Sequence, residues 1–336
     1  MAPARRSDVG KQFDDRRMNP HFVDCFHCRR FVTEFSIAFG KGARETWGKN
    51  HSCRQCAISL LFSYDEIESK SEEPLSIITS LSNPKIKEAV KLRDGKHRRR
   101  TGTFLIDGNR ELDRAEQAGV RILEVFTIQP AITFGNATVY QVTEQVMQKL
   151  VFGDRNEGIV AVAEEPVLSF DVFETKLSGK TSPLLAVLEG IEKPGNLGAV
   201  FRSADAGGLD GVMIAESLVD PFHSNSIRSS MGTVFSVPMV SESSAVIYRW
   251  LVDRQFQIAA AWCGSAVSYT AVDFCRPTAI VLGSEAEGLT EIWSGKEITS
   301  VTLPMLGIAD SLNVSVAAGI LFYEARRQRH LIRHNQ

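Results

Sequence analysis

Residues 303–326, with the sequence LPMLGIADSLNVSVAAGILFYEAR, decide the fold that we predict for this 336-residue chain. A strand-like stretch at 301–304 overlaps their start and ends at Pro304, which cannot donate to a strand ladder. A loop follows, and then an apolar, Ala-rich stretch predicts a helix with Asp310 or Ser311 as its N-cap. Because α/β proteins hold polar ligands where a helix begins beside the end of a strand, the segment predicts such a site.

Two further segments have the same character. Residues 189–208, EGIEKPGNLGAVFRSADAGG, follow an apolar run at 184–188 that reads as a buried parallel strand. Residues 279–289, AIVLGSEAEGL, run from a strand into a Gly-rich turn. A single turn of this kind is common in α/β proteins. The three segments together, in this order and spacing, resemble the motifs of the SpoU/TrmH family of RNA ribose 2′-O-methyltransferases, in the SPOUT superfamily.

The resemblance implies an α/β fold with two parts. Residues 183–330 are expected to form the catalytic domain, a mostly parallel sheet whose C-terminal segment threads a deep trefoil knot and which acts as a homodimer. Strands and helices also alternate over residues 76–163, which predicts a small α/β domain. There the stretch GKHRRRTGTFLIDGNREL, residues 95–112, resembles the start of the RNA substrate-binding domain of many SpoU proteins. Residues 164–182 are predicted to be a linker.

The family's methyl donor is S-adenosylmethionine, and the resemblance places its binding site in the second and third motifs. The expected contacts are made by Gly283, Leu303, Met305 and Leu312. Glycine at position 283 allows the backbone to approach a ligand closely, although a simple turn glycine is the alternative.

Arg202 matches the family's catalytic arginine. An arginine is always protonated, so it is a poor base, and a bidentate grip on the target phosphate is the more physical role. Four further residues of the motifs are expected to complete the catalytic site: Asn196, Glu285, Ser311 and Asn313. The alternatives are a surface arginine for Arg202, capping roles for Asn196 and Ser311, and an exposed turn carboxylate for Glu285.

Two segments are candidates for RNA contact. Arg228 and Ser230 lie in a stretch that resembles the family's phosphate-contacting segment, with a surface salt bridge as the alternative for Arg228. A basic run at 91–100 includes Arg98, Arg99 and Arg100. It predicts either a patch that meets phosphates or a solvated surface loop.

Four cysteines in residues 21–62 form two Cys-x-x-Cys pairs: Cys25, Cys28, Cys53 and Cys56. Two such pairs suit one tetrahedral structural Zn²⁺, and two disulfides are the alternative. His27 and His51 are expected to be neighbours rather than ligands. Residues 1–20 are predicted to be a disordered tail and residues 63–75 a linker.

Composition limits the function. The formal net charge is −2, no long apolar run is present, and no secretory signal precedes the cysteines, so we expect a cytoplasmic, reducing setting. A zinc hydrolase is disfavoured because four thiolates leave no open metal position. We expect methyl transfer to RNA, with ribosomal RNA favoured over transfer RNA. A catalytically silent RNA-binding protein is the alternative of a different class.

Overall fold

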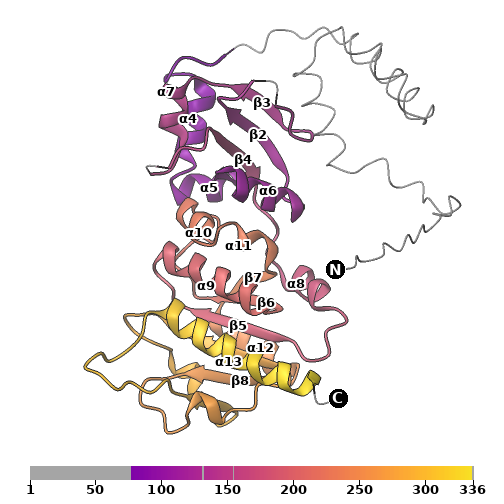
Figure 1. Ribbon diagram of the computed structural model, residues 1–336, viewed down its shortest axis with the longest axis vertical. Helices are drawn as coiled ribbons and strands as arrows, with labels where there is room; N and C mark the ends of the chain where they lie inside the picture. Colours follow the sequence, from indigo (N-terminus) through magenta and orange to yellow (C-terminus); the bar gives the residue numbers. More distant parts are fainter. Residues whose placement is uncertain (1–76, 131, 154, 335–336) are drawn as a thin grey trace, which may run out of the picture. The chain divides into compact units, whose positions relative to one another are not determined.

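The computed structural model describes residues 77–334, except residues 131 and 154. The predicted tail, cysteine module and first linker lie outside the described residues. The described residues belong to one compact unit with two sheets, which we call the N-terminal lobe and the C-terminal lobe (Figure 1). No helix in this part of the chain has the length and apolar character that crossing a membrane would need.

The N-terminal lobe has a four-stranded sheet in the order β1-β4-β2-β3. Strand β4 is antiparallel to both β1 and β2, and β2 is parallel to β3. Helices α4 and α7 pack on one face of this sheet, and α6 packs on the other. Its elements are α4 Pro84–Lys91, α5 Gly95–Thr101, β1 Thr103–Asp107, α6 Asn109–Gln117, β2 Ile122–Thr127, β3 Thr138–Gln141, α7 Glu144–Leu150 and β4 Ile159–Glu164.

The basic run is not a loop in this lobe. Asp94 caps α5 by accepting a hydrogen bond from the backbone N–H of Lys96, at 3.2 Å, and Gly102 ends the helix in the left-handed conformation. The run is therefore a short helix, and its two sides face different surroundings.

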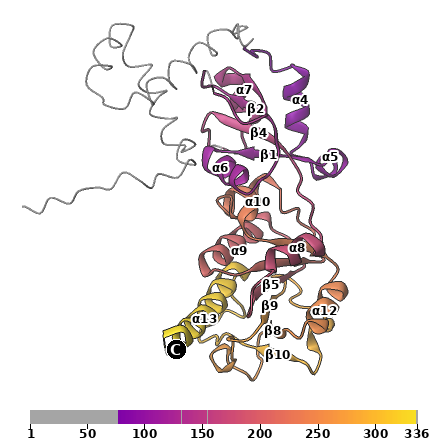
Figure 2. The same cartoon turned by 90° about the vertical axis from the view of Figure 1, so that its right-hand side faces the viewer.

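The C-terminal lobe has a six-stranded sheet in the order β10-β8-β9-β5-β6-β7, and every neighbouring pair is parallel. Helices α9 and α13 cover one face, and α8 and α12 cover the other (Figure 2). All six residues of β5 are buried, as a strand covered on both faces requires. The elements are α8 Phe170–Leu177, β5 Leu184–Glu189, α9 Pro194–Gly207, β6 Gly211–Ala215, α10 Ser224–Ser229, α11 Thr233–Ser236, β7 Met239–Glu242, α12 Ser244–Asp253, β8 Gln257–Ala261, η3 Tyr269–Ala271, β9 Thr278–Leu282, η4 Glu291–Ser294, β10 Ile298–Val301 and α13 Val314–His334.

The predicted linker at 164–182 is wrong in part, because it contains α8. Ser169 caps this helix, and the ring of Phe173 is buried beneath the sheet at 1% exposure. Gly211 makes room for that ring, since a Cβ there would lie 2.6 Å from it. A helix that buries one side chain has too little periodicity to be recognised in the sequence.

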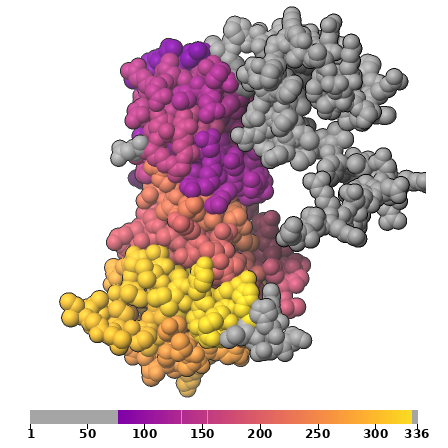
Figure 3. All heavy atoms as spheres, in the orientation of Figure 1, coloured from indigo at the N-terminus to yellow at the C-terminus, as the bar shows by residue number. Residues whose placement is uncertain are grey.

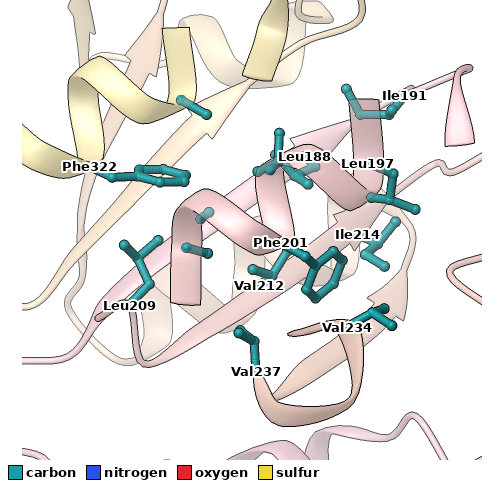
Figure 4. Packing of buried hydrophobic residues seen from close by; sticks show 14 of the residues in the cluster. Leu188, Ile191, Leu197, Phe201, Leu209, Val212, Ile214, Val234, Val237 and Phe322 are labelled. Atoms are coloured by element: carbon teal, nitrogen blue, oxygen red, sulfur yellow. The ribbon is translucent and has the colours of Figure 1, made fainter. Parts of the chain in front are cut away.

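Helix α9 is the centre of the C-terminal lobe. Phe201 and Leu197 point from it toward β6, and Phe322 of α13 closes the same cluster (Figure 4). On another side, Gly198 touches α10 so closely that a Cβ would overlap the Ser229 hydroxyl and the Ser226 carbonyl. Glycine at this position therefore sets the distance between α9 and α10.

The two lobes share a continuous core. Phe104 of the N-terminal sheet stacks on Phe222 at 4.8 Å between ring centroids and on Phe235 at 5.9 Å. Beside them Arg98 Nε donates to Asp220 Oδ2 at 2.5 Å. Buried aromatic stacking and a buried ion pair together fix one lobe against the other.

Candidate functional site

Three segments meet where β5 and β9 end and α13 begins. Asn196 lies in the first turn of α9 and donates its amide N–H to Glu285, in the turn after β9. The side-chain oxygen of Asn196 accepts from Asn313 Nδ2 at 3.3 Å. The structure thus brings together one polar side chain from each of the three sequence motifs, as predicted.

The cap of α13 differs from the prediction. Asn313, rather than Asp310 or Ser311, accepts from the N–H of Ser315 at 3.0 Å and from its hydroxyl at 2.6 Å. Ser311 is exposed, and its hydroxyl bonds to none of the described residues. Asn313 therefore both begins the helix and holds Asn196, whereas the Ser311 hydroxyl faces solvent.

Arg202 lies on α9 six residues after Asn196, a rise of about 9 Å along the helix axis. Its side chain is exposed and makes no hydrogen bond or ion pair with the described part of the chain. A guanidinium with no internal partner presents all of its donors to an external anion, and a phosphate matches their planar arrangement.

Glu189 is a residue of this site that sequence reasoning missed. It ends β5 with 2% exposure and accepts hydrogen bonds from the N–H of Thr290 at 2.8 Å and from its hydroxyl at 2.9 Å. Trp293 Nε1 donates at 2.8 Å, and the Ser244 hydroxyl donates as well. A carboxylate at the end of an otherwise apolar strand was the available signal. Glu189 anchors the segment that carries Glu285.

Gly283 stands where only glycine fits. A Cβ there would overlap the backbone carbonyl of Gly288 and lie 2.6 Å from the N–H of Leu289. The turn is closed by two hydrogen bonds of 3.1 Å between the backbones of Ser284 and Gly288. The glycine is therefore required by the turn, whether or not a ligand also approaches it.

The loop before α13 leaves its backbone groups available. Residues 304–312 form no hydrogen bond with another backbone group among the described residues. Leu303 and Met305 are half-buried, and Leu312 is exposed. Free backbone donors and acceptors beside apolar side chains fit a ligand with an aromatic ring and a polar edge.

The predicted RNA-contact residues require corrections. Arg98 is only 3% exposed, and it donates to the Leu92 carbonyl and to Asp220, so its charge is used inside the protein. Ser230 is fully buried, and its hydroxyl donates to the Ile227 carbonyl at 2.8 Å.

Arg228 also has an internal role. Its guanidinium donates to the carbonyls of Phe152 and Arg155 in the N-terminal lobe, the latter at 3.1 Å. By contrast, Arg99 and Arg100 are exposed on α5. Of the five predicted contacts, only these last two have exposed side chains, and Arg100 also hydrogen-bonds His97 Nδ1 through Nη2 at 2.8 Å.

Both lobes of the chain match known protein families. Residues 183–323 match the SpoU rRNA Methylase family, and residues 83–161 match the MRM3-like substrate binding domain. A 23S rRNA (guanosine(2553)-2′-O)-methyltransferase of Bacillus subtilis is 28% identical over 74% of this chain and 98% of its own. A 23S rRNA (guanosine-2′-O-)-methyltransferase of Bordetella pertussis is 32% identical over 65% of this chain and 82% of its own.

Solved structures of methyltransferases have the same fold. A crystal structure of an RNA 2′-O ribose methyltransferase is 37% identical and superimposes with a TM-score of 0.66, covering 75% of this chain and 99% of that one. An AdoMet-bound rRNA methyltransferase from Sinorhizobium meliloti is 28% identical, with a TM-score of 0.67 over 74% of this chain and 97% of its own. These likenesses define the class of protein as an RNA methyltransferase. The chain belongs to the SpoU rRNA methylase family.

Replacing Glu189 by alanine is expected to destabilise the protein by about 3 kcal/mol, because four donors lose a buried, charged acceptor. Amide hydrogen exchange should accelerate across residues 284–293, which this carboxylate anchors. Chemical denaturation and exchange measurements test this. Glu291→Ala, at an exposed position of the same segment, is the matched control and should change neither. Equal stability of both variants would remove the anchoring role.

Proposed function

We propose that this protein is an S-adenosylmethionine-dependent RNA 2′-O-methyltransferase that acts on ribosomal RNA. The carrying observation is Arg202, which has no partner among the described residues and lies on the helix that begins at the junction of Asn196, Glu285 and Asn313. The names of its relatives support the reaction, and ribosomal RNA is the substrate in the two relatives described above.

The donor site is proposed at the free loop before α13 and the turn after β9. Bound there, S-adenosylmethionine supplies an electrophilic methyl group. The backbone of Leu303 and Leu312 would meet the polar edge of its adenine, and Met305 would cover the ring. Gly283 keeps the turn narrow enough for this approach. Apolar side chains beside unpaired backbone groups are the combination that such a ligand needs.

Arg202 is proposed to bind the phosphate next to the target ribose and to stabilise negative charge on the 2′-oxygen. Asn196 and Glu285 hold the junction around the ribose, and the free Ser311 hydroxyl can donate to the nucleotide. A phosphate oxygen held by Arg202 can accept the 2′-proton. The guanidinium itself cannot act as the base because it remains protonated.

RNA is also proposed to contact the exposed side of α5 through Arg99 and Arg100. Each is a single positive charge on a chain that is slightly acidic overall. Two phosphate contacts would contribute a modest, salt-sensitive part of the affinity.

The dimer that the family resemblance implies has a candidate surface on α13. The inward side of this helix is buried at Ala318, Leu321 and Phe322. Its outward side carries Val316, Ile320 and Tyr323, at 50%, 37% and 55% exposure, with a spacing that places them on one stripe.

The loop before α13 carries two further apolar side chains, Leu306 and Ile308, which are almost completely exposed. In Figure 3 the yellow C-terminal segment lies on the face shown, and the loop before it projects from the body. We propose that a second copy covers this stripe and completes the site, because an exposed contiguous apolar surface marks an interface.

A trefoil knot in the C-terminal segment is part of the same proposal. The chain leaves β10 at one edge of the sheet and returns to pack α13 against α9, beside the central strand β5. The support for a threaded C-terminus is the resemblance to the SpoU family, and this return path is compatible with it.

For the cysteine module, which lies outside the described residues, we propose one structural Zn²⁺ held by Cys25, Cys28, Cys53 and Cys56. The spacing of two Cys-x-x-Cys pairs supports it.

Arg202→Ala is expected to lower methyl transfer by about 100-fold or more, because the variant loses phosphate positioning and charge stabilisation. Transfer of tritiated methyl groups to unmodified large-subunit ribosomal RNA transcripts measures this under single-turnover conditions. Arg249→Ala is the matched control, since Arg249 is an exposed helical arginine on α12. Near wild-type turnover in Arg202→Ala would refute the assignment. Donor binding by the wild type without transfer to any RNA would favour the catalytically silent alternative.

Ile320→Asp is expected to convert a dimer into a monomer, since it places a charge in the centre of the apolar stripe. Light scattering coupled to gel filtration measures the mass. Val252→Asp is the control, because Val252 is 42% exposed on α12, on the opposite face of the sheet. A wild type that is monomeric at micromolar concentration would contradict the proposed interface.

Zinc is expected at one ion per chain in protein purified without chelators, and Cys25→Ser or Cys53→Ser should lose it. Elemental analysis by mass spectrometry measures the metal, and Cys263→Ser, outside the module, serves as the control. Because the module is distant in sequence from the three motifs, donor affinity should not change. Metal-free wild-type protein would exclude a structural zinc.

A further inference from the structure

A cleft of about 400 Å³ lies between the C-terminal end of α6 in the N-terminal lobe and the pair α9 and α11 in the C-terminal lobe. The proposed donor site does not use it, although Asp205 lies in the first of the three motif segments. The walls of the cleft come from both lobes. The side chains that carry the argument are Arg114, Gln117, Ala118, Asp205, Phe235 and Ser236.

The walls of the cleft are fixed. Arg114 Nη1 donates to the Met231 carbonyl across the lobe junction at 2.6 Å. The same arginine packs over Gly232, where a Cβ would lie 3.1 Å from its Cδ. The Arg98–Asp220 pair fixes the same two lobes. The cleft is thus a preformed feature, as small-ligand sites commonly are.

The lining of the cleft favours a nucleobase over a phosphate as its ligand. Asp205 accepts from the Ser236 hydroxyl at 3.2 Å and keeps further acceptor capacity. A phosphate in the cleft would meet this carboxylate and be repelled. A nucleobase would instead donate its amino or imino N–H groups to Asp205, accept from Arg114, and lie against the half-buried ring of Phe235.

The position relates the cleft to the site of reaction. Asp205 follows Arg202 by three residues on α9, so the two side chains lie on one side of that helix, about one turn apart. A phosphate held by Arg202 would therefore lie about one helical turn from the position of Asp205.

We propose that this cleft binds an unpaired nucleobase near the target nucleotide and so contributes to the choice of RNA site. The proposal rests on the proposed function, because it requires RNA as the substrate. It adds a recognition element that is separate from the donor pocket and from the basic helix α5.

The test uses the full-length protein with unmodified large-subunit ribosomal RNA transcripts, and it measures RNA affinity as well as methyl transfer. Ala118→Trp fills the cleft from an exposed position, and Ala245→Trp, at an exposed position of α12, is its control. Asp205→Asn removes the carboxylate, with Asp253→Asn on α12 as its control. Donor affinity is measured in every variant.

Both cleft variants should weaken RNA binding and lower kcat/KM for RNA by about tenfold, the lower part of the range for losing one stacked base. Donor affinity and both controls should stay at the wild-type level. RNA affinity within twofold of wild type in both cleft variants would overturn the proposal. Tighter RNA binding by Asp205→Asn would also overturn it, because that result means a phosphate occupies the cleft.

RNA binding separates this inference from the proposed function. If the wild type binds RNA but transfers no methyl group, the proposed reaction fails. Weaker binding by the cleft variants would still support a nucleobase site under that outcome, and unchanged binding would reject it.

Discussion

The hydrogen bonds of the Asn196 amide are the interaction on which the proposed site depends. They join Asn196 to Glu285, which is 89 residues away in the sequence, and to Asn313, which is 117 residues away. An amide can do this because it carries donors on one side and an acceptor on the other. These long-range hydrogen bonds form only if local interactions already hold each of the three segments in place. Gly283 closes one turn, Asn313 caps its own helix, and Glu189 anchors the segment that follows β9.

The sequence predicted what depends on local patterning. Buried parallel strands appear as uninterrupted apolar runs, and β5 and β9 were recognised in this way. The family resemblance placed Asn196, Glu285 and Asn313 in one site, and the structure brings these three side chains together. The choice of Asn313 as the cap was not, since asparagine, serine and aspartate cap helices almost equally well. Glu189 was missed because its donors, at Thr290 and Trp293, lie a hundred residues away.

The predictions for Arg98 and Arg228, which the structure corrected, show a second limit of sequence reasoning. A basic run gives charge, but it does not say which side of a seven-residue helix faces inward. On α5 that side carries Arg98, which is bound to Asp220, whereas Arg99 and Arg100 face outward. Arg228 likewise holds backbone carbonyls of the other lobe. Buried charges of this kind cost desolvation energy unless they are paired, so their pairing commits the two lobes to one arrangement.

Because the two lobes are held in one arrangement, the exposed side of α9 has a fixed position relative to both lobes. One side of the helix is buried on the sheet, and Gly198 fixes its distance from α10. Its exposed side carries Arg202 and, one turn later, Asp205 at the edge of the cleft. Helical spacing is rigid, so the distance between the proposed phosphate contact at Arg202 and the proposed base site at the cleft is set by the backbone rather than by flexible loops. A fixed distance can select an RNA conformation, because only a strand with that spacing between phosphate and unpaired base can satisfy both.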